Sequence, residues 1–228
     1  MDNQEYMLFG KPIERLEKPF CEKCSELLKN EKYQLCYNCH KEKDDLYFGK
    51  IRAPGIYKSK KKDGNYLSEI IKRFKYDLTM YEGTRWKIAE EFANLLYEYA
   101  LDEYEIVSGV DFLVPIPMTE EKEDKKGFNH TRMVVEKFSE KVEIDAEYGN
   151  LVKIRETEPQ TNLTKSERRE NVKGVFDVLN PHRFKGKKVL LIDDVVTTCS
   201  TVNECAKVMR NAGAQEVNVL ALARDTYR

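Results

Sequence analysis

Residues 189–201, VLLIDDVVTTCST, place two adjacent carboxylates between an aliphatic run and a group of hydroxyl side chains. The run Val189–Ile192 has the composition of a buried strand. Glu204 follows Thr201 at the spacing of a capping box, which predicts that a helix begins at Thr201. Asp193 to Ser200 is therefore predicted to be a loop that joins the carboxyl end of a strand to a helix. Ligands of open α/β sheets bind at that edge.

The chemistry of residues 193–201, here called the acid-pair segment, suits a sugar phosphate. A helix start offers unpaired backbone amides and the positive end of a dipole, which together with hydroxyl donors can hold a phosphate. Paired carboxylates suit vicinal sugar hydroxyls or a hard cation such as Mg²⁺. An acidic turn before an ordinary helix cap would account for only one acid and one hydroxyl residue. The hydroxyl residues are Thr197, Thr198, Ser200 and Thr201.

Four cysteines form the pattern Cys21-x2-Cys24-x11-Cys36-x2-Cys39. Two such knuckles supply four thiolates that can converge on a tetrahedral Zn²⁺, and an all-cysteine set is typical of a structural metal. A metal would also stabilise residues 1–48, which have too few aliphatic residues for a core. His40 completes a CxxCH haem-attachment pattern, but the second CxxC pair favours zinc. Zinc with His40 in place of one cysteine, and disulfides, are less favoured alternatives.

The composition limits the class of protein. The chain has 228 residues, of which 41% are hydrophobic and 35% charged, and its formal charge is −1. The near-zero charge excludes overall basicity as an argument for nucleic-acid binding. No apolar run reaches the ~20 residues that a transmembrane helix needs, and the first 20 residues lack the apolar region of a signal peptide. We expect a cytoplasmic protein.

The remaining pattern predicts an α/β domain over residues 50–228 behind a zinc-binding module over residues 1–48. Continuous aliphatic strands alternate with amphipathic helices, which favours a mostly parallel sheet covered by helices on both faces. The expected strands are 51–57, 110–118, 151–155, 172–179, 188–192 and 216–223, and the expected helices are 66–76, 84–104, 131–142 and 202–212.

Two further segments carry cations that could meet anions. Residues 119–133 follow a strand and contain Lys125, Lys126 and Gly127, where a glycine would let backbone amides approach a second anion. Residues 155–176 are predicted to include a polar, mobile stretch that could close over a leaving group. An ordinary solvated loop and a charged surface helix are the respective alternatives.

Residues 189–201, VLLIDDVVTTCST, resemble the thirteen-residue phosphoribosyl-pyrophosphate (PRPP) signature of type I phosphoribosyltransferases. The resemblance implies that Asp193 and Asp194 hold the ribose hydroxyls and that the loop over 119–133, after the strand VPIPM (114–118), binds pyrophosphate. It also makes Lys126, Arg168 and Arg169 candidate catalytic residues. Glycine is usual where Cys199 stands, so this position departs from the signature. The implied phosphate-binding residues are Val195, Val196, Thr197, Thr198, Cys199, Ser200 and Thr201, and those near the pyrophosphate are Lys126, Gly127, Phe128 and Asn129.

The whole set of motifs resembles the ComF family of competence-associated proteins. VPIPM (114–118), KGFN (126–129), residues 155–176 and ALAR (221–224) follow a cysteine-rich start in the order typical of that family. The resemblance implies a link to uptake of transforming DNA and binding of PRPP with Mg²⁺, with transfer to an unknown acceptor. A non-catalytic factor that senses a ligand or handles single-stranded DNA is the alternative, with single-stranded DNA or a competence helicase as possible partners.

Lysines and aromatic residues also interleave around the cysteines, among them Phe20, Tyr33 and Tyr37. Such groups would suit phosphate contacts and base stacking. Acidic residues are mixed with them, so a module that docks on the rest of the chain or on a protein partner is an equal alternative.

Overall fold

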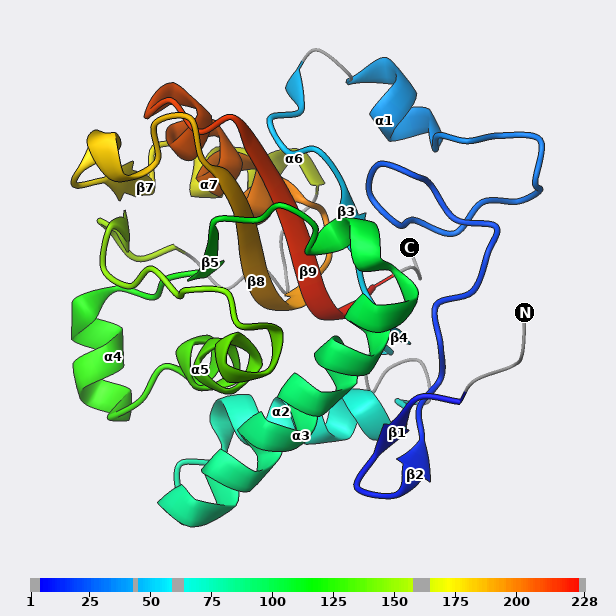
Figure 1. The fold of residues 1–228 in the computed structure, drawn as a ribbon, viewed down its shortest axis with the longest axis vertical. Coiled ribbons are helices and arrows are strands. Elements are labelled where there is room, and N and C mark those ends of the chain that lie inside the picture. The colour runs from blue at the N-terminus through cyan, green and yellow to red at the C-terminus, as the bar shows by residue number, and fades with distance from the viewer. Residues whose placement is uncertain (1–4, 43–44, 59–63, 158–164, 226–228) are drawn as a thin grey trace.

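A computed structural model describes residues 5–42, 45–58, 64–157 and 165–225, except for the side chains of Lys165, Ser166 and Arg168. Figure 1 shows a central twisted sheet with helices on both sides and the N-terminal segment along one edge. Among these residues, no helix is both long and apolar enough to cross a membrane.

The central sheet is parallel, as the sequence predicts. Its order is β3-β9-β8-β5, and β4 also pairs with β9. Both long strands, β8 and β9, lie in the middle of the sheet, where an aliphatic strand can be buried on both faces. The strands are β3 (Ile51–Arg52), β4 (Gly55–Ile56), β5 (Phe112–Pro115), β8 (Lys188–Val196) and β9 (Glu216–Arg224).

Alternating side chains of β8 enter two separate cores. Leu190 and Ile192 pack with α3 and α5, whereas Val189 and Leu191 pack with α7. This alternation is the period-2 geometry of a strand. Helices therefore cover both faces, with α2 and α3 lying across one side (Figure 1). The helices are α2 (Tyr66–Tyr76), α3 (Glu82–Asp102), α5 (His130–Val142) and α7 (Ser200–Asn211).

Smaller elements surround this sheet. The hairpin of β1 (Met7–Leu8) and β2 (Lys11–Pro12) is antiparallel, and Leu8 reaches the core beside α3. Strands β6 (Leu151–Lys153) and β7 (Phe176–Val178) form an antiparallel ribbon of their own, so the predicted strand over 172–179 is shorter and lies outside the parallel sheet. The remaining helical elements are α1 (Tyr37–Lys41), α4 (Glu120–Lys126), α6 (Lys165–Val172), η3 (Tyr104–Ile106) and η5 (Pro181–Arg183).

Two predictions about the acid-pair segment are wrong. Strand β8 continues through both acids to Val196, because β9 pairs with it along its whole length, as far as Arg224. Helix α7 begins at Ser200 after the N-cap residue Cys199, whose side chain makes no cap hydrogen bond, so Thr201 lies inside the helix and there is no capping box.

The predicted loop over 119–133 is largely helical. Helix α4 begins after the Thr119 side chain, which accepts from the Lys122 amide, and it ends at Gly127 in the left-handed conformation. The polar stretch over 157–171 contains the start of helix α6, and residues 158–164 lie outside the described part of the chain.

Candidate functional site

The two acids lie in adjacent positions of β8, so their side chains point toward opposite faces of the sheet. Asp194 faces the side covered by α2 and α5. Its Oδ2 lies 2.6 Å from Lys75 Nζ and 3.4 Å from His130 Nε2. The Asp194 side chain is only 8% exposed and that of Lys75 is 32% exposed, so the pair buries its carboxylate more than its ammonium. Asp193 is half-buried, and its Oδ1 accepts a hydrogen bond from the Asp194 amide.

The surroundings shift the pKa values of the two carboxyl groups in opposite directions. Burial alone would raise the pKa of Asp194, but the Lys75 ammonium, followed by His130, holds it well below its usual range. Burial, followed by the charge of Asp194, raises the pKa of Asp193. Asp194 is therefore the carboxylate that stays ionised, whereas Asp193 takes up a proton more readily.

Lys126 and His130 extend this charged group. Lys126 Nζ lies 3.2 Å from His130 Nδ1. Burial is the main cause that lowers the pKa of His130, to about 4, so its imidazole is neutral at pH 7. Because an ammonium only donates, Nδ1 is the acceptor and Nε2 carries the proton toward Asp194. Lys126, His130, Asp194 and Lys75 thus form one continuous polar chain.

Lys126 is also a cation whose charged form a bound anion would stabilise. Burial lowers the pKa of Lys126 to about 8, with a further lowering by Lys75. Within the described part of the chain, no salt bridge involves Lys126. Its Nζ and the Arg85 guanidinium lie 4.2 Å and 3.9 Å from the centre of the Phe128 ring. The Phe128 ring thus contacts two cations beside the acid pair.

Gly127 and Asn129 have structural tasks in this segment. Gly127 has φ +76° and ends α4, and its amide donates to the Glu123 carbonyl at 2.7 Å. Nothing lies within 4 Å of a Cβ placed there, so the left-handed backbone accounts for the glycine. The buried Asn129 caps α5, because its side chain accepts from the Arg132 amide at 3.1 Å.

The turn from β8 into α7 has the geometry of an anion cradle. Cys199 adopts a left-handed backbone with φ 66°, which explains why glycine is usual at this position of the signature. Its side chain gives α7 no cap, so the first amides of this 12-residue helix rely on other acceptors. The hydroxyl groups of Thr198 and Ser200 lie 2.9 Å apart beside them.

The predicted flap cations lie elsewhere. Arg169 Nη2 is 2.5 Å from Glu42 Oε2, which ties α6 to the cysteine-rich segment. Both residues line a cavity of about 260 Å³ with Thr198 and Ser200 of the acid-pair segment. Arg168 lies on α6, and its side chain is outside the described part of the structure. The described contacts thus join Lys126 through His130 to Asp194, and Arg169 to Glu42.

The four cysteines converge as their spacing predicts. Their Sγ atoms all lie within 4.8 Å of one another, and the cluster can hold a metal ion. Cys24 and Cys36 Sγ are 3.7 Å apart. Four thiolates at the usual Zn–S distance of about 2.3 Å would lie about 3.8 Å apart, so these donors fit zinc. His40 is exposed and outside the group.

Sequence reasoning missed three residues of the charged group: Lys75, His130 and Arg85. Each lies on a helix far from the acid pair in the chain, and nothing in the local pattern marks His130 or Arg85. One weak signal existed, because Lys75 lies at the C-terminal end of an amphipathic helix next to the apolar face that contacts the sheet.

Comparison with known proteins assigns the class. The family model "Phosphoribosyl transferase domain" matches residues 132–226. "Competence protein F" of Haemophilus influenzae is 29% identical over 210 residues, which cover 90% of this chain and 85% of that protein. "DNA utilization protein YhgH" of Escherichia coli O157:H7 is 30% identical over 114 residues, or 50% of this chain and 49% of that protein.

Among solved structures, the glutamine PRPP amidotransferase of B. subtilis is similar, with a TM-score of 0.40 and 17% identity over 59% of this chain and 26% of that one. The parallel sheet and the family match together define a type I phosphoribosyltransferase-like α/β protein. The motifs and the relatives narrow this class: the chain is similar to the competence-associated proteins of the ComF family.

The ion pair of Lys75 with Asp194 should control stability in a pH-dependent way. We expect Lys75→Met to lower the free energy of unfolding by about 2 kcal/mol at pH 7, because the Asp194 carboxylate stays buried without its main cation. The Asp194 pKa is low in the parent, so the pair's contribution is complete above about pH 4 and is lost only below that. In the variant this pKa rises, and protonation relieves the penalty. The loss should therefore narrow between pH 7 and pH 4.5 in urea unfolding.

Lys141→Met is the matched control, because Lys141 pairs at the same distance of 2.6 Å with Glu90, whose side chain is 41% exposed. That variant should lose less than about 1 kcal/mol and show no such pH trend. Replacing Asp194 by Asn in the Lys75→Met background should recover most of the loss. Equal losses in the two lysine variants at both pH values would contradict the assignment.

Proposed function

We propose that the chain binds PRPP with Mg²⁺ at the carboxyl end of β8 and displaces pyrophosphate from the ribose with an acceptor. The observation that carries this proposal is the turn from β8 into α7. It combines a helix start that the N-cap side chain does not cap, a left-handed residue at Cys199 and adjacent carboxylates at the carboxyl edge of a parallel sheet.

The proposed roles follow from the contacts of each acid. Asp194 engages both oxygens, Oδ1 with the Val195 amide and Oδ2 with Lys75. Asp193 forms no salt bridge among the described residues and contacts only the amide and carboxyl groups of Asp194, so it is the better candidate for a ribose hydroxyl or Mg²⁺. Its raised pKa also means that a bound cation would displace a proton from it. Residues 197–201 would hold the 5′-phosphate.

The cations around Asp194 are suited to the pyrophosphate end of the ligand. Lys126 is a partly desolvated ammonium without a salt bridge among the described residues, and a leaving pyrophosphate would increase the charge that it stabilises. Bound Mg²⁺ would neutralise part of the same charge. For Arg169 to close over the leaving group, it would first have to release Glu42.

Binding of PRPP tests this proposal. Calorimetric titration of the parent with PRPP and Mg²⁺ should give saturable binding. The double variant Asp193→Asn/Asp194→Asn should weaken it at least a hundredfold, because hydrogen bonds to charged groups contribute about 1.5–3 kcal/mol each. Lys126→Met should weaken it less. Asp177→Asn, at an exposed position of β7, is the control and should bind like the parent.

A pyrophosphate-release assay with candidate acceptors then separates catalysis from sensing. Release in the parent supports the transferase. Saturable binding without release from any acceptor would favour a non-catalytic sensor. Parent-like binding by the double variant would show that the acid pair is not the ligand site.

We also propose that the four-cysteine cluster holds Zn²⁺. Metal analysis of the purified chain should find one zinc per molecule, and Cys24→Ser should lose it, because three remaining thiolates bind more weakly. Cys205→Ser is the control: this cysteine is buried on α7 within the core, outside the four-cysteine group, so its loss should leave the zinc in place. Full zinc content in Cys24→Ser would contradict the assignment.

Single-stranded DNA is a second candidate ligand, for which the exposed aromatic residues of the cysteine-rich segment are the specific observation. The side chains of Tyr33 and Tyr37 are 62% and 76% exposed, and Lys41 lies over the Tyr37 ring. Exposed rings beside cations suit base stacking along a phosphate backbone. The DNA-related name of the E. coli relative is consistent with this candidate.

Fluorescence anisotropy with a labelled oligothymidine tests the DNA candidate. The Tyr33→Ala/Tyr37→Ala variant should bind at least tenfold more weakly than the parent, since each stacked base contributes about 1–3 kcal/mol. The control is Tyr81→Ala, because Tyr81 is 86% exposed at the start of α3. Equal affinity of both variants, or no binding by the parent, would reject this surface.

A further inference from the structure

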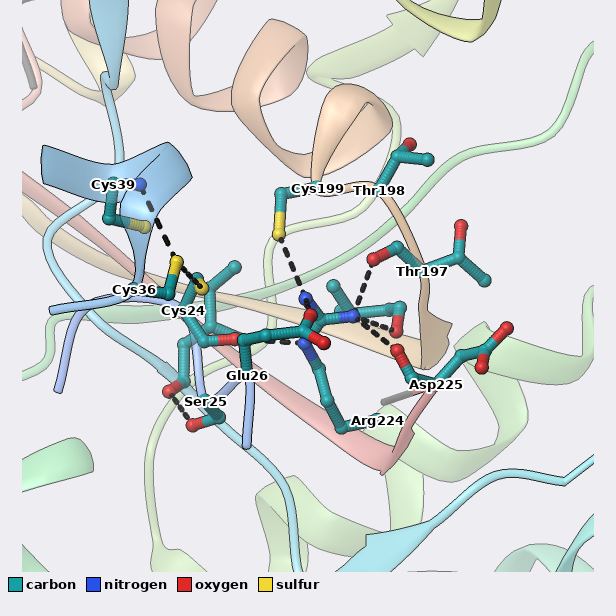
Figure 2. Close-up of polar contacts among 12 residues, drawn as sticks. Cys24, Ser25, Glu26, Cys36, Cys39, Thr197, Thr198, Cys199, Arg224 and Asp225 are labelled. Atoms are coloured by element: carbon teal, nitrogen blue, oxygen red, sulfur yellow. Dashed lines mark hydrogen bonds and ion pairs between the residues drawn. The ribbon is translucent and has the colours of Figure 1, made fainter. Parts of the chain in front are cut away.

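A single buried arginine joins the four-cysteine cluster to the acid-pair segment. Arg224 is the last residue of β9, and its side chain is 2% exposed. On the cysteine side, Nε donates to the Cys24 carbonyl at 2.9 Å, and Nη2 lies 2.7 Å from Glu26 Oε2. Figure 2 shows the guanidinium between the two sites, with Cys24 and Glu26 on one side of it.

The same guanidinium holds the backbone that leads into α7. Nη1 donates to the carbonyl oxygens of Val196, at 2.9 Å, and Thr197. Nη2 also lies 3.7 Å from Cys199 Sγ. Arg224 therefore holds the backbone where the proposed phosphate-binding residues begin. Its other nitrogen atoms contact Cys24 and Glu26 in the cysteine-rich segment.

A second feature brings the two sites together. Cys199 and Cys24, one of the four cluster cysteines, line the same cavity of about 260 Å³. Cys199 is the left-handed residue immediately before α7, so its position decides where the first helical amides point. The four-cysteine cluster is thus linked to the turn through Arg224, which contacts both the Cys24 carbonyl and Cys199 Sγ.

These contacts cannot change independently. A buried guanidinium needs partners for its charge and its donors, and removing part of them is costly. If Cys24 and Glu26 move when the metal leaves, Arg224 must either move with them or lose their contacts. In the first case it releases Val196 and Thr197. Both outcomes alter the turn that precedes the helix.

We propose that Arg224 is a positioning residue that couples metal binding at Cys21, Cys24, Cys36 and Cys39 to phosphate binding at residues 197–201. The phosphate arm of this inference rests on the proposed function. Coupling between two sites is reciprocal, so the sugar phosphate must strengthen metal binding by the same factor by which the metal strengthens sugar-phosphate binding. The metal thereby acts on the ligand site without touching the ligand.

The experiment measures this factor in the full-length protein. Zn²⁺ affinity is determined by competition with a chelator, with and without saturating PRPP and Mg²⁺, after correction for Mg²⁺ and PRPP binding to the chelator. The parent should bind Zn²⁺ at least fivefold more tightly when PRPP is present. In Arg224→Lys, which keeps the charge but not the bridging fork, the factor should fall to about one.

Arg52→Lys is the matched control. Arg52 is also a buried arginine and donates to the carbonyl of Glu22 in the cysteine-rich segment, while its other described contacts are with Ile51, Glu103 and the Phe20 ring. This variant should weaken Zn²⁺ binding yet keep the fivefold effect of PRPP. A merely structural role for Arg224 would lower both affinities and leave the factor unchanged, which would overturn the inference.

Hydrogen exchange separates failure of this inference from failure of the proposed function. In the zinc-loaded protein without PRPP, Arg224→Lys should speed exchange at residues 196–201 at least tenfold but not at residues 217–220 of β9. If PRPP fails to bind the parent, the proposed function fails, and this exchange result alone decides the coupling. Parent-like exchange at 196–201 in the variant, or equal Zn²⁺ affinity with and without bound PRPP in the parent, would overturn it.

Discussion

The burial of β8 on both faces is the constraint on which the rest of the structure depends. Leu190 and Ile192 fill one core while Val189 and Leu191 fill the other, so a shift of one residue would exchange the contents of both cores. That fixed register determines where Asp193 and Asp194 emerge. It also sets the starting point of α7, and hence the direction in which its first amides face.

The acid pair is less symmetric than its sequence implies. Because neighbouring side chains in a strand point to opposite faces, only Asp194 meets Lys75 and His130. This partnership keeps Asp194 ionised, while Asp193 stays more readily protonated. Two identical residues thus acquire different chemical properties, and a ligand that binds both would meet one engaged and one available carboxylate. Lys126 contacts the other ring nitrogen of His130, so a second lysine lies near Asp194.

The cysteine-rich segment is joined to the sheet by specific polar contacts. The Ser25 hydroxyl donates to the Ile51 carbonyl at 2.6 Å, and the Ile51 amide donates to the Lys23 carbonyl at 2.8 Å. The first knuckle is therefore hydrogen-bonded to β3. Arg224 adds the buried link to the carboxyl ends of β8 and β9. Hydrogen bonds of Arg224 therefore connect the four-cysteine cluster to the turn before α7. The predicted boundary between residues 48 and 50 stays a prediction.

The sequence determined the parallel sheet, most helix positions, the four-cysteine cluster and the turn after β8. These follow from local patterns, namely aliphatic runs, helical periodicity and fixed spacing. Such patterns extend over a few residues and can be recognised in the sequence alone. Only the tertiary structure decided which charges meet. Lys75 reaches Asp194 across 119 positions, and Arg224 reaches Cys24 across 200. Such pairs depend on how helices dock on the sheet, and apolar packing sets that docking. The local sequence around a polar residue therefore does not show which polar partner it will meet.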